Sequence, residues 1–282
     1  MAGKQVTELD ALPSFTDNSL LPVHNGAGLK KGLLSQLANY LGNKFSNPNL
    51  LINPDFKINQ RGATSYEKQG YSVDRWKIWN VTVSPSTSGG ITVKNDKYTD
   101  TGTFLQYLEN ATEGDSTLSC YVTSVSGTVT MVADDNSQVI LKQGLNIVHT
   151  SKSTRAFTIF LNKGTSITLK WVKLEQGKVA TAYIVPNPAE ELLKCKRYYD
   201  FSALHFYGVC NSNGSLNENL VLYRHFRTSP TFSTNATYSK NVTVSTLALK
   251  GSNDGGYYLY VRTPTSGTYE LDLTIKADAE IY

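Results

Sequence analysis

The chain of 282 residues carries 27 Lys and Arg against 23 Asp and Glu, which gives a net charge of +4. Only 18% of its residues are charged, below the roughly 25% of an average soluble domain, and 40% are hydrophobic, which is too many for a disordered chain. A positive charge this weak and diffuse argues against nucleic acid as a partner.

No run approaches the ~18 consecutive apolar residues of a membrane span, and the opening MAGKQVTELD lacks the basic and apolar blocks of a signal peptide. We therefore expect neither membrane insertion nor export by the secretory route. Tyrosine supplies 17 side chains and is accompanied by abundant Thr, Ser, Asn and Gly. This composition is typical of β-sheets whose outer faces are polar but uncharged.

Residues 1–46 are predicted to contain an extended stretch followed by one short helix. Asn25 and Gly26 form a turn signal, and a helix is predicted over residues 29–42 because leucines recur there at helical spacing. These leucines are Leu29, Leu33, Leu34, Leu37 and Leu41. A helix of about three turns is unstable alone, so its leucine stripe must dock on other copies or on a larger structure, or fold back on the following domain.

Residues 47–185 are predicted to form a jelly-roll β-sandwich. Period-2 alternation or short β-branched runs recur in eight or nine segments, such as WKIWNVTVS and SITLKWVKLE, with turn signals such as ADDNS between them. Short strands at this spacing, without a long helix among them, are typical of that architecture.

A linking helix is predicted within residues 186–200, starting at residue 188. Asn187 can cap it, and Pro188 fits the first helical position. Acidic residues occupy the first turn and basic residues the last, as the helix dipole favours. These residues are Glu190, Glu191, Lys194, Lys196 and Arg197.

Residues 201–282 return to about six strands separated by turns such as NSNGS and SNDGG, which predicts a second, smaller β-sandwich. The fold class is therefore all-β. An N-terminal extended segment with a short helix precedes the jelly-roll sandwich, the linking helix and the C-terminal sandwich.

The motifs of the chain resemble those of bacteriophage and prophage fibre or receptor-binding proteins. They are LLINPDFKINQRG (50–62), YSVDRW (71–76), WVKLEQGKVATAY (171–183), PNPAEELLKCKRYY (186–199), RTSPTFS (227–233) and the final LTIKADAEIY. The opening residues 8–41 are similar to virion-attachment segments of such fibres, and residues 50–183 also resemble carbohydrate-binding jelly-roll modules. The resemblance implies a virion component, usually a homotrimer, with a lectin-like sandwich.

Sugar recognition needs an aromatic face for the C–H side of a pyranose and planar polar groups for its hydroxyls. In a strand over residues 76–80, Trp76 and Trp79 lie on opposite faces, so one is predicted to be in the core and the other nearer the surface. The candidate sets are Trp79 with Arg75 and Lys77, Trp171 with Lys173 and Glu175, and the tyrosines Tyr257, Tyr258 and Tyr260. Packing in the core or between subunits is the alternative role for each.

The candidate glycan contacts are therefore Arg75, Trp79, Trp171, Tyr257 and Tyr258. No enzymatic activity is expected, because the sequence has no GxSxG, P-loop or HExxH motif, and its carboxylates lie in turns rather than facing one another. Three cysteines without a CxxC pair and four scattered histidines predict neither a zinc site nor a complete disulfide set, so no metal or other cofactor is expected.

Together these observations predict a phage virion fibre or appendage protein that is made in the host cytoplasm. It would be a homotrimer, attached through its N-terminal segment to other virion proteins of the tail, the portal region or the capsid, and would contribute to adhesion to a host-surface glycan. The alternatives are a structural head fibre or decoration without a glycan ligand, and a carbohydrate-binding module of a glycan-degrading system. The sequence leaves the choice between head and tail open.

Overall fold

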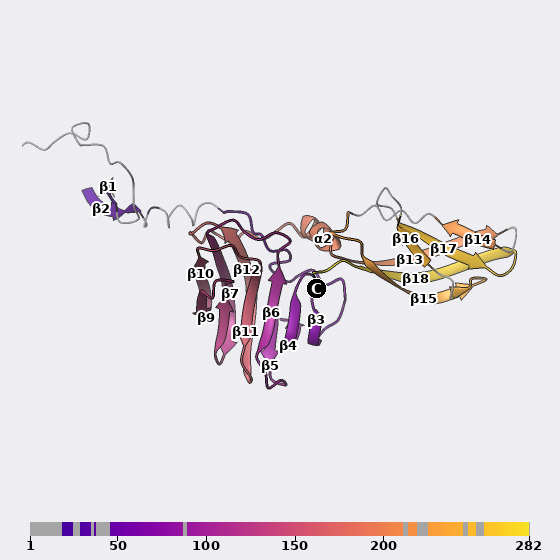
Figure 1. The fold of residues 1–282 in the computed structure, drawn as a ribbon, viewed down its shortest axis with the longest axis horizontal. Coiled ribbons are helices and arrows are strands. Elements are labelled where there is room, and N and C mark those ends of the chain that lie inside the picture. Colours follow the sequence, from indigo (N-terminus) through magenta and orange to yellow (C-terminus); the bar gives the residue numbers. More distant parts are fainter. Residues whose placement is uncertain are drawn as a thin grey trace, which may run out of the picture.

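The computed structural model describes residues 19–24, 29–34, 37, 46–86, 89–210, 214–218, 225–244, 248–251 and 257–281. Strands dominate this part of the chain, which confirms the predicted all-β class. Figure 1 shows two β-structured bodies that meet near helix α2 (Pro188–Lys196), with the strands of the second running along the long axis of the molecule and those of the first running across it.

The first body, here called the first sandwich, is a ten-stranded sheet in the order β10-β7-β12-β5-β4-β6-β11-β8-β9, with β3 paired to β4. All of its strand pairs are antiparallel. Its strands are β3 (Tyr66–Tyr71), β4 (Lys77–Pro85), β5 (Ile91–Asn95), β6 (Gly102–Tyr107), β7 (Ser116–Ser126), β8 (Val129–Val132), β9 (Gln138–Ile140), β10 (Gly144–Thr150), β11 (Ala156–Leu161) and β12 (Thr165–Gln176).

Strand β4 is the corner at which the sheet turns to form two layers. Its residues 77–79 pair with β6, whereas residues 82–85 pair with β5. Asn80 lies between the two stretches at φ +51°, a left-handed conformation that Asn tolerates better than most residues. The bend allows the two halves of the sheet to enclose a common core.

An aromatic cluster forms the centre of this core. The ring of Trp76 stacks on Phe104 at 4.7 Å, and Phe56 and Phe157 complete the cluster. Trp76 is fully buried and its Nε1 donates to the carbonyl of Asn53 at 2.9 Å, whereas 47% of Trp79 is exposed. The prediction that one of these two tryptophans is in the core and the other nearer the surface is confirmed.

The second body, here called the second sandwich, stacks two three-stranded sheets, in the orders β13-β18-β15 and β14-β17-β16. Its buried core is small and consists of Leu259, Val261, Leu271, Leu273 and Ile275. Its strands are β13 (Tyr199–Cys210), β14 (Gly214–Glu218), β15 (Thr231–Lys240), β16 (Ala248–Gly251), β17 (Tyr257–Thr263) and β18 (Gly267–Asp278).

The predicted linking helix is confirmed as α2. The Asn187 side chain accepts a hydrogen bond from the Ala189 N–H at 2.9 Å, and Pro188 occupies the start of the helix. The helix ends at Lys196 rather than at residue 200, because β13 begins at Tyr199. No helix among the described residues has the length and apolar character needed to cross a bilayer.

The N-terminal segment differs from its prediction. Residues 29–33, placed at the start of an amphipathic helix, form strand β2 (Leu29–Leu33), which pairs with β1 (Leu20–His24), while the turn signal at Asn25 and Gly26 lies outside the described residues. Gly32 disfavours a helix, and the hairpin satisfies the backbone instead.

The remaining attachment leucines are only partly described. Leu33 and Leu34 are half-buried, and Leu34 and Leu37 have helical backbone geometry. Leu37 is 42% exposed, and Leu41 lies outside the described residues. The prediction that five leucines form a stripe on a single helix is thus wrong for Leu29 and Leu33, which belong to β2.

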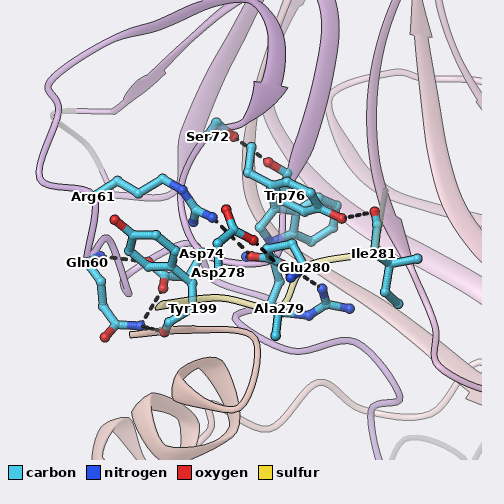
Figure 2. A network of polar contacts seen from close by, with 12 residues as sticks. Gln60, Arg61, Ser72, Asp74, Trp76, Tyr199, Asp278, Ala279, Glu280 and Ile281 are labelled. Atoms are coloured by element: carbon cyan, nitrogen blue, oxygen red, sulfur yellow. Dashed lines mark hydrogen bonds and ion pairs between the residues drawn. The ribbon is translucent and has the colours of Figure 1, made fainter. Parts of the chain in front are cut away.

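A buried polar network joins the two sandwiches (Figure 2). Glu280, after β18, returns to the first sandwich, where its carboxylate pairs with the Arg75 guanidinium and lies 3.3 Å from Arg61 Nη2. Arg75 is 1% exposed, and its guanidinium lies 3.5 Å from the centre of the Tyr198 ring. Burial raises the pKa of Glu280, and Arg75 and Arg61 oppose this shift.

Further contacts anchor the linking segment. Asn53 N–H donates to the buried Glu191 of α2 at 2.7 Å, and Gln60 Nε2 donates to both Asp74 and the Tyr199 carbonyl at 2.6 Å. These residues belong to the INPDF, NQRG, YSVDRW and KRYY stretches that carry the resemblance. In this fold, the motifs hold the two sandwiches together.

Candidate functional site

A groove lies on the outer face of the sheet formed by β10, β7 and β12, at one end of the first sandwich (Figure 1). Antiparallel pairing places outward-facing residues of the three strands side by side, because alternate residues of each strand point to the same face. The three resulting rows are Leu145–Tyr121–Trp171, Ile147–Ser119–Lys173 and His149–Thr117–Glu175.

A buried ion pair holds the wall of the groove, which is formed by residues 178–183. Lys173 Nζ lies 3.1 Å from Glu175 Oε2, and both side chains are almost completely buried. Lys173 Nζ also donates to Thr181 Oγ1 at 2.6 Å and to Ser46 Oγ at 3.2 Å, while the Thr181 N–H donates to Glu175 at 2.9 Å. A fully hydrogen-bonded pair of this kind fixes the wall against the sheet.

The fixed wall completes an aromatic surface. Tyr183 stacks on Trp171 with ring centroids 4.5 Å apart and planes 1° from parallel, and Tyr121 lies 6.2 Å from Trp171 on the neighbouring strand. Burial, together with the charges of Asp55 and Glu191, raises the pKa of Tyr183 above its usual range, so its phenol is neutral. Tyr121 is 39% exposed and presents its ring to solvent.

The groove encloses about 510 Å³, a size that suits a small ligand. Ser119 lies in its lining and is 1% exposed, yet its hydroxyl has no hydrogen-bond partner among the described residues. An unpaired buried hydroxyl costs about 1–3 kcal/mol, and the enclosure of this atom keeps it from direct contact with a ligand in the groove.

His149 lies at one end of the groove, at the border with a second hollow of about 340 Å³ that it shares with Lys178. Thr117 Oγ1 donates its proton to the Gly177 carbonyl at 2.7 Å and contacts His149 Nδ1 at 2.9 Å. Because a hydroxyl has one proton, Nδ1 must donate to it, which leaves Nε2 of neutral His149 as an acceptor.

The structure brings only part of the predicted polar set to the groove. Trp171 lies in it, but Lys173 and Glu175 are buried beneath the wall and position it. A β-bulge in β12 next to Trp171 also places Lys170 on the outer side, with Nζ 5.9 Å from the Tyr121 ring centre, whereas strict alternation along the strand places Lys170 on the face opposite Trp171. Trp79 is exposed on β4 and lies outside the groove lining.

Arg75 does not lie beside Trp79 on one strand face, as the sequence had predicted. Residues 72–76 form a turn in which Ser72 N–H donates to the Trp76 carbonyl at 2.7 Å, and Arg75 has a φ of +72°. Because β4 begins only at Lys77, the alternation that placed Arg75 beside Trp79 does not extend to it. Its guanidinium turns inward to Glu280.

The two candidate tyrosines lie in the second sandwich, apart from the groove. Tyr257 packs against Phe232 in a T-shaped contact at 4.7 Å and lies on the inward side of β17, and burial raises its pKa. Tyr258 points to the opposite face of the strand and is half-buried. Tyr257 therefore belongs to the edge of a core, and the five candidate residues do not form one site.

Sequence reasoning missed Tyr121, Tyr183, Ser119, Leu145 and Ile147. Tyr121 does interrupt a run of residues that are otherwise suited to burial in β7, which is a signal in the sequence. The others depend on strand register and on the return of residues 178–183 over β12, neither of which a single sequence reveals.

Among the described residues, no group of three or more His, Cys, Asp or Glu side chains is placed to hold a metal ion. Cys120, Cys195 and Cys210 are buried, and burial raises the pKa of Cys120 to about 12 and that of Cys195 above its ordinary value. The Cys120 and Cys195 thiols are therefore protonated at neutral pH.

No protein-family profile and no curated protein matches this sequence. Two solved structures of discoidin II from Dictyostelium discoideum have a low similarity to this chain. The wild-type protein is 12% identical, with 62% of this chain and 75% of that chain covered and a TM-score of 0.21. The recombinant protein is 13% identical, with 66% and 79% covered and a TM-score of 0.23. Because both TM-scores lie below 0.5, neither similarity carries an argument about ligand or mechanism.

Proposed function

We propose that this protein is a fibre or appendage of a bacteriophage virion, made in the host cytoplasm, and that its first sandwich binds a glycan of the host surface. It acts as a homotrimer, is attached to other virion proteins through residues 1–46, and has no enzymatic activity. The virion setting is supported by the resemblance of the sequence motifs. The glycan role is supported by one observation, the preformed aromatic groove with His149 and Lys178 in its lining.

The groove offers the two kinds of contact that a sugar needs. The Tyr121 and Trp171 rings supply apolar faces, and His149 and Lys178 supply polar partners along its length. The wall is already fixed by the Lys173–Glu175 pair, so little conformational entropy is lost on binding.

The absence of catalysis is supported by the groove lining. Among the described residues that line it, none is Asp or Glu. Glycoside hydrolysis needs two carboxyl groups about 5–10 Å apart across the scissile bond. A binding function therefore fits the groove better than a glycan-degrading one.

A structural role without a glycan ligand is the second candidate, and one observation favours it. Leu145 and Ile147 are 57% and 36% exposed beside the aromatic residues, and an apolar patch of this kind also suits contact with another protein. The test of the proposal must therefore separate binding of sugar from contact with protein.

The test is a glycan array probed with the full chain, followed by calorimetric titration of the best ligand. Trp171→Ala should weaken binding by at least about tenfold, or ~1.4 kcal/mol, because it removes an apolar face.

Trp79→Ala is the matched control, because it removes an exposed tryptophan from the same sandwich but outside the groove. It should bind as the wild type does. Circular dichroism shows whether each variant is folded. The glycan proposal fails if no glycan binds, or if Trp171→Ala and Trp79→Ala bind equally well.

A further inference from the structure

The second sandwich is incompletely covered at the β13 edge of one of its sheets. Leu271 and Leu273 of the central strand β18 are at most 1% exposed, whereas Leu204 and Phe206, on the core-facing side of β13, are only half-buried. Among the described strands, β18 alone pairs with β13. Strand β13 is twelve residues long, and an edge strand of this length is a template for pairing with another chain unless something covers it.

Strand β13 carries apolar side chains on both of its faces, with His205 as the one polar residue among those of its outer face from Phe201 to Val209. In addition to the core-facing Leu204 and Phe206, its outer face carries Phe201, Tyr207 and Val209, which are 39%, 66% and 63% exposed. Strands with apolar residues on both faces are typical of positions covered on both sides, whereas a solvated outer face alternates with polar residues. The residues of β13 thus fit a strand inside an assembly.

The charges around this face suit contact with an identical surface. His205 Nδ1 lies 2.6 Å from Asp272 Oδ1, and Glu270 stands opposite Lys240 in the register of β18 and β15. The face therefore has balanced charges. When copies of one chain meet through the same face, a balanced face avoids the like-charge repulsion that a one-signed face creates.

We infer that the outer face and free edge of β13, with Phe201, Tyr207 and Val209 at its centre, form the surface through which copies of this chain associate. The occupant is a second copy, and the strands of neighbouring copies lie along one common axis, because β13 runs along the long axis of the molecule (Figure 1). The inference rests on the proposed homotrimer and names the surface that forms it.

The experiment measures the mass of the full chain by light scattering and sedimentation at micromolar concentrations. The wild type should be an oligomer. Val209→Lys and Tyr207→Lys should each raise the dissociation constant at least about tenfold and shift the chain toward monomer, since a charge would be buried at the contact. Both side chains are largely exposed in the single chain, so the fold should be retained, as circular dichroism would show.

Ile140→Lys is the matched control, because Ile140 is 57% exposed on β9 of the first sandwich and is also β-branched. It should leave the oligomer intact. A wild type that is monomeric overturns both this inference and the proposed homotrimer. The inference alone is overturned if the oligomer persists in Val209→Lys and Tyr207→Lys, or if it is lost equally in Ile140→Lys. Glycan binding is measured separately, so its result does not depend on the oligomeric state.

If a different protein covers β13, the wild type should be monomeric and should bind another virion component. Val209→Lys should then lose that binding. This result also overturns the inference.

Discussion

The two sandwiches of this protein bury their hydrophobic cores to different extents. In the first, a long sheet bends at β4 and encloses an aromatic core in which Trp76, Phe104 and Phe157 are fully buried. In the second, two three-stranded sheets stack and leave the core-facing side chains of β13 half-exposed. A sheet that bends round on itself encloses its own core, whereas a narrow stack needs further cover.

The difference shows how each body can serve the molecule. The core of the first sandwich is enclosed within the single chain, and this body can present a rigid groove to a ligand. The second depends on what lies beside it, including the first sandwich at the junction and, by our inference, other copies along β13. Three predictions test this contrast.

The largest effect is expected at the junction. Arg75→Ala leaves Glu280 buried without its main partner, and breaking a buried ion pair in this way costs about 3–5 kcal/mol. Urea unfolding should show a loss of that size, with the second sandwich unfolding earlier than in the wild type. Lys97→Ala, which removes an exposed pair with Glu67, is the control and should cost less than about 1 kcal/mol. Equal effects of the two substitutions would mean that the junction does not support the second sandwich.

The next prediction compares the loss of stability when one phenylalanine is truncated in each of the two cores. Phe104→Ala should destabilise the chain by about 3–5 kcal/mol, because its ring is fully enclosed. Phe206→Ala in the second sandwich should cost only about 1–2 kcal/mol, because its half-buried site leaves less of a cavity. Thermal unfolding measures both. If Phe206→Ala cost as much as Phe104→Ala, the second sandwich would be closed as the first is.

The smallest effect is a pH dependence from Glu280. Burial raises its pKa in the folded chain above the ordinary value of 4.5, so between these two values the folded state binds a proton that the unfolded state lacks. The contribution of Glu280 to stability therefore falls as pH rises through this window and grows as pH falls, by at most about 1.4 kcal/mol per pH unit. Glu280→Gln cannot titrate.

The measurement compares the free energy of unfolding of the wild type and Glu280→Gln between pH 4 and 7. The wild type should gain stability relative to Glu280→Gln as the pH falls. A constant difference would show that Arg75 and Arg61 offset burial completely, and a difference of opposite sign would show that they outweigh it.

Local chemistry made much of the fold predictable. The capping Asn187, the first-turn Pro188 and the charged turns of α2 act within a few residues of one another, so a single sequence reveals them. The alternation around Trp76 and Trp79 likewise follows from the pleat of a strand. Where a turn or bulge interrupts the pleat, as at Arg75 and beside Trp171, the same reasoning assigns the wrong face.

The sequence by itself therefore determined the all-β class, the linking helix and that Trp76 and Trp79 lie on opposite faces, one in the core and one nearer the surface. Only the tertiary structure decided which residues meet. The row of Leu145, Tyr121 and Trp171 exists because three strands pair in one register, and the Arg75–Glu280 pair joins residues that are distant in the chain. Such contacts depend on register and on chain return, which are settled by burial of the whole core rather than by neighbouring residues.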